Sequence, residues 1–376
     1  MNIGIDLRCL PADGSPGGGI AHAARAISRA MAAREATVWF VPQGARPDDG
    51  SPGSGCSSSR VLLPDASRRT LLRALHAHAC DAFFVPSGAV PFGLPIPAYP
   101  WIHDLDIFSH PEWFPQSFFR RALTTHMVLR GMRRAPAVFA VSAYAKRQCI
   151  ERGLLDPATI RVTGEGGDAI LAGLTADSRA KLRRKTQSIL MRFGIARPYM
   201  LILGTAEPRK NIPFIARIWP QVSRVLPGID LVIAGRDGWR MQDIPRALED
   251  ARISAASDIL RVKNIEDDER RALLLHASLV LVPSLSEGFG LVALEAAQAG
   301  VPVLLSNRGA LPEILGEGEW CLDPEDDALW VRAMVRIIAD TDCRLSWLSS
   351  QAESAKRWSW MKAADIILRG IRETYD

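Results

Sequence analysis

Residues 283–300 read Pro-Ser-Leu-Ser-Glu-Gly-Phe-Gly-Leu-Val-Ala-Leu-Glu-Ala-Ala-Gln-Ala-Gly, a polar turn that leads into an apolar helical pattern. The apolar run at 277–282 just before it predicts a buried parallel strand. Glu287 then lies in the loop after the strand, and Glu295 lies inside the helix. The stretch therefore predicts a strand, loop and helix of an open α/β sheet, with a glutamate on each side of the helix start.

The start of this helix has the features of a diphosphate site. Free backbone N–H groups near Phe289, Gly290 and Leu291 would face outward at the positive end of the helix, and Gly288 and Gly290 would let the backbone approach a ligand closely. Glu287, before the helix, and Glu295, inside it, could reach the two ends of that ligand, which would be a sugar and a ribose. The pattern indicates a nucleotide sugar, although an ordinary βα unit with two chance glutamates gives the same pattern.

The bulk composition is that of an ordinary globular protein. The chain has 376 residues, of which 48% are hydrophobic and 23% charged, and this length predicts two domains. It has no apolar run of membrane-spanning length, and its first residues lack the pattern of a signal peptide, so we expect a cytoplasmic protein. Six scattered cysteines indicate neither disulfides nor zinc, and the net charge of +5 fits an anionic substrate or surface as well as a nucleic acid.

Short apolar runs alternate with helical or turn-rich sequence along the chain, which predicts two doubly wound Rossmann-like α/β domains in series. We place the domains at 1–178 and 179–359, with a ligand cleft facing the carboxyl ends of both sets of strands. Residues 42–59, rich in glycine, proline and serine, predict a mobile loop. The expected strands are 3–7, 38–41, 82–85, 99–102, 137–141, 200–203, 231–234, 277–282 and 301–305, and the clearest helices are 20–33 and 179–193.

Two adjacent cations, Arg209 and Lys210, follow the first expected strand of the second domain. An arginine fork and a lysine point charge at that strand end could neutralise a pyrophosphate and stabilise a leaving nucleoside diphosphate. The alternative is a solvated basic turn. Their expected position opposite Glu287 and Glu295 favours the phosphate site.

Three motifs of the second half carry a resemblance to a known family: Gly204-Thr-Ala-Glu-Pro-Arg-Lys-Asn211, Ser284-Leu-Ser-Glu-Gly-Phe-Gly-Leu-Val-Ala-Leu-Glu295 and Gly300-Val-Pro-Val-Leu-Leu-Ser-Asn-Arg-Gly-Ala-Leu-Pro-Glu-Ile-Leu-Gly316. They resemble the donor lobe of retaining glycosyltransferases of family four, which have the GT-B fold. The first half matches in kind and order. Its motifs are Ile3-Gly-Ile-Asp-Leu-Arg8, Gly17-Gly-Gly-Ile20, His103-Asp-Leu105, Ser142-Ala-Tyr-Ala-Lys146 and Ile160-Arg-Val-Thr-Gly-Glu-Gly-Gly-Asp168.

The resemblance implies sugar transfer from a nucleotide-diphosphate donor, with retention of configuration and no required metal or cofactor. By resemblance, Glu287 contacts the transferred sugar, Glu295 the ribose, Arg209 and Lys210 the diphosphate, and the amides of 289–291 the phosphates and sugar. Thr205 stands where many members have an arginine, so Arg209 carries more of the phosphate binding. Many members also have a proline where Val292 stands.

In the first lobe the resemblance places His103 at the reacting centre, in a hydrogen bond with the donor sugar, and Asp104 on the acceptor side. Without the resemblance, a lone histidine at a strand end is more often structural. Gly18 and Gly19 belong to an expected flexible loop over the donor phosphates or the acceptor. The segment Trp358-Ser-Trp360 looks like the point from which a final helix, 360–376, packs back on the first lobe.

Two other patterns are discounted. Gly17-Gly-Gly-Ile-Ala-His22 lacks the third glycine of a dinucleotide fingerprint and lies far from its strand. Asp104-Leu-Asp106 has the spacing of a metal-binding tripeptide but lacks a third ligand, so no metal site is predicted.

The sequence therefore predicts a metal-independent, retaining hexosyltransferase that acts on a saccharide or lipid-linked saccharide in bacterial surface polysaccharide or exopolysaccharide synthesis. The alternatives are a GT-B-fold epimerase or phosphorylase, or a non-catalytic sugar-nucleotide binding subunit. No nucleic-acid partner is expected. Residues 118–134 alternate apolar and basic residues, which would suit peripheral docking on an anionic membrane, while the ordinary alternative is an amphipathic helix packed on the first sheet.

Overall fold

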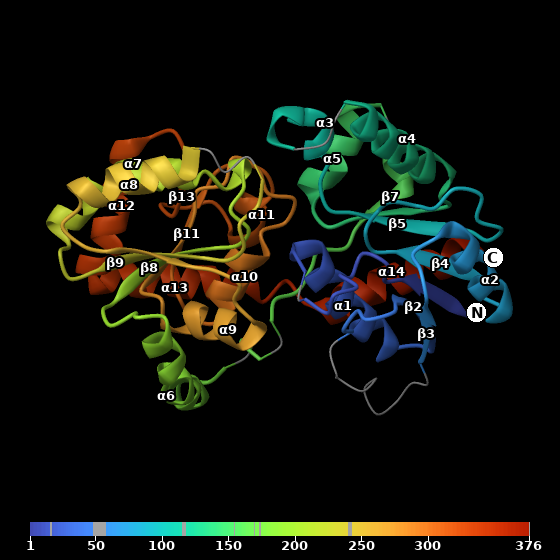
Figure 1. The fold of residues 1–376 in the computed structure, drawn as a ribbon, viewed down its shortest axis with the longest axis horizontal. Coiled ribbons are helices and arrows are strands. Elements are labelled where there is room, and N and C mark those ends of the chain that lie inside the picture. The colour runs from blue at the N-terminus through green and yellow to red at the C-terminus, as the bar shows by residue number, and fades with distance from the viewer. Residues whose placement is uncertain are drawn as a thin grey trace. The chain divides into compact units, whose positions relative to one another are not determined.

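The computed structural model describes residues 1–15, 17–47, 58–114, 118–153, 155–168, 170–172, 174–239 and 243–375, and within 118–127 it leaves the side chains of 118, 120, 121, 124 and 127 undescribed. The chain divides into two compact units, each with its own sheet (Figure 1). Unit 1 comprises Met1–Ser109, Gln116–Gly166 and Trp358–Asp376, and unit 2 comprises His110–Pro115 and Gly167–Arg357. Most of the predicted mobile loop, 48–57, lies outside the described residues.

Unit 1 is built on a seven-stranded parallel sheet with the order β3-β2-β1-β4-β5-β6-β7. The strands are β1 (Ile3–Asp6), β2 (Thr37–Pro42), β3 (Ser59–Leu63), β4 (Ala82–Val85), β5 (Ala98–Ile102), β6 (Val138–Ala140) and β7 (Ile160–Val162). The α-helices are α1 (Gly19–Ala32), α2 (Arg68–Ala77), α3 (Asp106–Ser109), α4 (Phe118–Arg134), α5 (Ala143–Glu151) and α14 (Trp360–Tyr375).

Unit 2 has a six-stranded parallel sheet with the order β10-β9-β8-β11-β12-β13. Its strands are β8 (Tyr199–Leu203), β9 (Asp230–Ala234), β10 (Ile259–Val262), β11 (Leu279–Val282), β12 (Val303–Ser306) and β13 (Cys321–Leu322). Its α-helices are α6 (Ala176–Arg192), α7 (Ile212–Val225), α8 (Asp243–Ser254), α9 (Asp267–His276), α10 (Leu291–Gln298), α11 (Leu311–Leu315), α12 (Asp327–Ala339) and α13 (Thr341–Ala355).

Both sheets reverse their strand order once, at β1/β4 in unit 1 and at β8/β11 in unit 2. Chain connections leave such a pair of strands in opposite directions, so a crevice opens beyond the carboxyl ends of the strands. The two doubly wound sheets confirm the fold class expected from the alternating pattern. The loops after β8 and β11 are the ones that carry Lys210 and Glu287.

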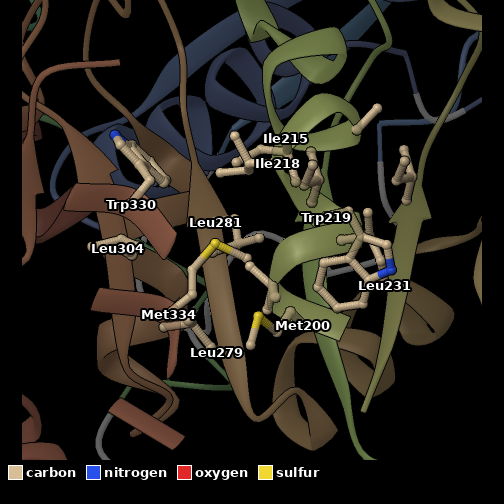
Figure 2. Close-up of a cluster of buried hydrophobic side chains, with 14 of the residues drawn as sticks. Met200, Ile215, Ile218, Trp219, Leu231, Leu279, Leu281, Leu304, Trp330 and Met334 are labelled. Carbon is tan, nitrogen blue, oxygen red and sulfur yellow. The ribbon is translucent and has the colours of Figure 1, made fainter. Parts of the chain in front are cut away.

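The core of unit 2 holds this strand-end region in place. Figure 2 shows Met200 of β8 lying beside Leu279 and Leu281 of β11, with Trp219 of α7 and Trp330 of α12 on either side. Alternate strand residues face the same side of a sheet, so Leu279 and Leu281 both enter this layer. Burying each such side chain contributes about 1.5–3 kcal/mol, which anchors β8 and β11 next to each other.

Four short strands were missing from the sequence prediction, namely β3, β7, β10 and β13. Each lies at an edge of its sheet, where part of the strand stays solvent-accessible, so none has the long continuous apolar run that identified the central strands. The predicted loop 42–59 extends one residue too far, because Ser59 already belongs to β3 and pairs with Val38 of β2.

Candidate functional site

The loops that follow β8 and β11 lie against each other in unit 2. The two strands are hydrogen-bonded neighbours, and beyond their carboxyl ends the Leu285 amide donates to the Arg209 carbonyl at 2.7 Å. Arg209 and Lys210 form a single 3-10 turn, which Asn211 ends in a left-handed conformation with φ 52° before α7 begins. The chain therefore delivers two cations to the end of β8 that lies beside β11.

A compact ionic cluster forms there around Glu287. Lys210 Nζ lies 2.5 Å from Glu287 Oε1, and Arg209 Nη1 lies 3.8 Å from Oε2. Ser284 Oγ donates to Glu287 Oε1 at 2.7 Å, and Arg209 Nε also bonds the buried Glu207. The structure thus brings together Arg209, Lys210 and Glu287 as the sequence predicted.

The charges of this cluster decide the ionisation of Glu287. Burial alone would raise the pKa of this carboxyl, but the charges of Lys210 and Arg209, with hydrogen bonds from Lys210 and Ser284, outweigh it and lower the pKa below its ordinary value. Glu287 is therefore ionised at neutral pH. Arg209 and Lys210 keep 23% and 17% of their side chains exposed, so both can reach an incoming anion.

The helix that follows Glu287 begins at Leu291, with Gly290 as its N-cap. Gly290 has φ 105°, a left-handed conformation that favours glycine, and a Cβ there would lie 2.7 Å from Leu311 Cδ2. The first amides of an α-helix lack the usual acceptor four residues earlier in the helix, so the start of α10 can bind an anion a few residues after Glu287. Phe289 is buried, with 4% of its surface exposed, so its side chain belongs to the core of this turn.

Glu295 has different surroundings from Glu287, the first glutamate of the same motif. It lies inside α10 with 1% of its side chain exposed, and its Oε2 is bonded by Arg270 of α9. Arg270 also bonds Asp168 at 3.0 Å. The second glutamate is therefore held in a buried ionic network that the sequence gave no reason to expect.

His103 follows β5 in unit 1 and is engaged at both ring nitrogens. Nε2 lies 2.8 Å from the Pro86 carbonyl, so this nitrogen carries a hydrogen, and Nδ1 lies 3.1 Å from Glu165 Oε1. Burial alone would lower the pKa of the imidazole, but the hydrogen bond and charge of Glu165 outweigh it and raise the pKa above its usual value. A hydrogen bond from His103 to a sugar would replace one of these two contacts.

The remaining candidates are scattered over the described structure. Gly18 is the N-cap of α1 and Gly19 its first residue, so these two glycines begin a helix, and the expectation of a flexible loop at 17–19 is wrong for them. Thr205 follows β8, with its Cγ2 close to Gly238. Asp104 accepts the Asp106 amide at 3.2 Å, and the buried Asp106 carboxylate accepts from Gln148.

Sequence reasoning missed four polar residues that hold the candidate groups in place: Glu207, Ser284, Glu165 and Arg270. Ser284 and Glu207 stand within three residues of candidates, so their proximity was a usable signal. Glu165 lies inside a quoted motif but was assigned no role. Arg270 belongs to a helix that carried no motif at all.

Within the described ranges, no group of three or more His, Cys, Asp or Glu side chains is arranged to hold a metal ion. Among the same residues, no helix combines the length and apolar character needed to cross a bilayer.

Most of unit 2 matches a known protein family. Residues 193–357 match the family described as Glycosyl transferases group 1. The O-antigen chain mannosyltransferase B of Escherichia coli is 27% identical over 266 residues, which cover 69% of this chain and 65% of that relative. The chain thus spans less than two thirds of that relative's length, and it spans 29% of the length of another curated relative.

Solved structures resemble the whole chain. Anabaena Alr3699/HepE, in complex with UDP and glucose, has a TM-score of 0.74 at 17% identity and covers 99% of this chain and 100% of its own. WaaG, a glycosyltransferase involved in lipopolysaccharide biosynthesis, has a TM-score of 0.72 at 15% identity, with coverage of 98% and 99%. These likenesses establish the fold. The chain accordingly has the GT-B fold, and its residues 193–357 match the group 1 glycosyltransferases.

Proposed function

We propose that this protein is a retaining glycosyltransferase that moves a hexose from a nucleotide-diphosphate sugar to a saccharide or lipid-linked saccharide. The observation that carries the proposal is the pairing of Lys210 and Arg209 with Glu287, beside the start of α10, within the residues that match the family. A fold alone hosts many functions, whereas this arrangement has a specific chemical use.

The cations and the carboxylate have separable roles in this proposal. Arg209 and Lys210, both partly exposed, would bind the diphosphate and stabilise the negative charge that grows on it as the glycosidic bond breaks. The first-turn amides of α10 would add hydrogen bonds at the positive end of the helix. Glu287, which is ionised, would accept hydrogen bonds from hydroxyl groups of the transferred sugar.

The proposal also gives roles to two residues of the first unit. His103 is the proposed partner of the transferred sugar, and its Nε2–H, which now faces the Pro86 carbonyl, is the hydrogen that would be redirected to a sugar hydroxyl. Asp104 is the proposed acceptor-side residue. Glu295 would bind the ribose, and Thr205, Gly18 and Gly19 would complete the donor contacts.

The named relatives suggest which donors to test first. One solved relative binds UDP and glucose, and one curated relative is a mannosyltransferase of an O-antigen chain. UDP-glucose and GDP-mannose are therefore the primary candidates. The O-antigen name also supports a role in bacterial surface polysaccharide or lipopolysaccharide synthesis, and the proposal places this role in the cytoplasm.

We expect purified protein to turn over one of these donors in the presence of EDTA as fast as with added magnesium. On this proposal Arg209, Lys210 and the helix start bind the diphosphate, so a divalent ion is not needed to hold it. Donor binding is first measured by thermal shift, because a ligand that binds only the native state raises its stability. Release of nucleoside diphosphate with an oligosaccharide acceptor is then measured with and without EDTA.

Three results would contradict parts of this proposal. Loss of turnover with EDTA that magnesium or manganese restores would show that a metal is required. A product of inverted configuration at the anomeric carbon, seen by proton NMR, would remove the retaining mechanism. Nucleoside diphosphate release without any acceptor would favour an epimerase, and donor binding without turnover would favour a binding subunit.

We also propose that α4 docks this protein on anionic membranes. Phe119 and Leu123, one helical turn apart, are 83% and 61% exposed, and a surface pocket of about 320 Å³ is lined by His126, Leu129, Arg130, Arg133 and Arg134. Exposed apolar and cationic side chains on one helix suit a lipid interface. Gly131 and Met132 are buried, so the helix also packs inward.

On this proposal, the protein should float with vesicles that contain anionic lipid, and changing Arg133 and Arg134 to glutamine should weaken binding about fivefold for each residue. Salt should weaken it further, because exposed charges are screened. Arg246→Gln, which changes an exposed arginine of α8 in unit 2, is the matched control. Absence of flotation at low salt would leave α4 with a structural role only. Arg120 and Arg121 belong to the same predicted face, but their side chains are not described.

A further inference from the structure

Arg270 joins two buried carboxylates from separate parts of unit 2. Its Nη1 bonds Glu295 Oε2, and its Nη2 lies 3.0 Å from Asp168 Oδ2. The side chains of Glu295 and Asp168 are 1% and 3% exposed, whereas that of Arg270 is 16% exposed. One guanidinium therefore bonds two carboxylates that are almost completely removed from water.

Neighbouring contacts hold this network rigidly. Arg271, the next residue of α9, places its Nε 2.7 Å from the same Asp168 oxygen. Gly167 lies so close to α10 that a Cβ at this position would approach Gln298 Oε1 to 1.9 Å. The segment that begins at Gly167 is thus fixed against both α9 and α10, and Arg270 is fixed with it.

This network determines whether the buried carboxyl group of Glu295 is ionised and how it is oriented. A buried carboxylate stays ionised only when a charged or hydrogen-bonding partner compensates for the lost water. Because the guanidinium donors lie in one plane, the contact of Nη2 with Asp168 also fixes the direction from which Nη1 meets Glu295. Without Arg270, Glu295 would lose its charge partner from α9 and the orientation that this partner imposes.

We propose that Arg270 is a positioning residue that keeps Glu295 ionised and oriented to accept hydrogen bonds from the ribose diol of the donor nucleotide. The proposal rests on the donor role given above to Glu295. Arg270 itself does not touch the ribose. Its effect is therefore expected on the preference for ribose over deoxyribose, and only secondarily on the overall affinity for nucleotide.

The test measures binding of UDP and GDP, and of their 2′-deoxy and 3′-deoxy forms, by isothermal titration calorimetry. The wild-type protein should bind the better ribonucleotide about tenfold more tightly than at least one deoxy form, as expected for a hydrogen bond to a charged acceptor. Arg270→Gln should reduce this ratio to below about twofold. The matched control is Arg271→Gln, which removes a second arginine from Asp168 but leaves Arg270 on Glu295, and it should keep the ratio.

The outcomes separate the inference from the function on which it rests. A wild-type preference that persists in Arg270→Gln overturns the positioning role and leaves the donor role of Glu295 standing. Absence of any preference in the wild-type protein overturns both. If Arg270→Gln does not fold, Arg270→Lys decides, because it keeps the charge but has no pair of coplanar nitrogens with which to join Glu295 to Asp168. An unchanged ratio in that variant contradicts the proposal, and a reduced ratio supports it.

Discussion

Replacing Lys210 with methionine should lower kcat about a hundredfold at saturating donor. Methionine keeps much of the length of the side chain but removes the ammonium group that lies 2.5 Å from Glu287. On the proposed function, this charge stabilises the nucleoside diphosphate as it leaves, so its loss acts on the transition state more than on the ground state. Steady-state kinetics on the donor selected by thermal shift measure the effect.

The same substitution should change how Glu287 titrates. In the wild-type protein the lowered pKa of Glu287 contributes stability that is present above the unfolded pKa and is lost as pH falls through the folded pKa. Removing Lys210 raises the folded pKa, so this contribution shrinks and disappears at a higher pH. Lys356→Met, in an exposed pair with Glu353, is the control, since surface pairs contribute little. Wild-type kcat in a folded Lys210→Met variant would remove the phosphate role from this lysine.

Replacing Glu165 with glutamine should lower kcat about tenfold at pH values just above the usual histidine pKa of about 6.5. Glutamine cannot compensate the charge of the imidazolium, so the raised pKa of His103 should fall and the ring should lose its second proton near neutral pH. Asp104 also faces His103 electrostatically, and its charge remains in the variant. The pH profile of kcat, compared between the wild type and the variant, measures the shift.

The pH dependence of unfolding provides an independent test of the His103–Glu165 pair. A raised folded pKa means that the pair stabilises the native state fully below the unfolded pKa and that this contribution is lost as pH rises through the folded pKa. Urea unfolding should therefore separate wild type from Glu165→Gln at about pH 6 and much less at about pH 9. The exposed pair of His110 and Glu112 supplies the control, Glu112→Gln. Equal differences at both pH values would show that the charge of His103 is not involved.

The central strands and the Lys210–Glu287 pair could be predicted because both depend on local sequence. Buried parallel strands need continuous apolar runs, and loops that follow neighbouring strands meet at one sheet edge, so a cation after β8 and a carboxylate after β11 were expected to lie together. The motif resemblance added the functional assignment. It did not add the pairing itself, which follows from topology.

The contacts of Glu295 and His103 could not be predicted in this way. Arg270 reaches Glu295 from another helix, and Glu165 reaches His103 from the segment after a different strand. Which side chains meet across two packed elements depends on the register and distance of their packing, and single-sequence patterns do not contain this information. The start of α1 was misjudged for a different reason, because glycines favour turns but also occupy helix N-caps.

The C-terminal helix α14 has a consequence for the order in which this protein can acquire its structure during synthesis. Its buried residues, among them Ile367 and Ile371, belong to unit 1, and Asp365 pairs with Arg34 beside α1. Unit 2 consists of residues that are all translated before α14. The ribosome therefore completes every residue of unit 2 before unit 1 receives α14, the helix that packs on α1.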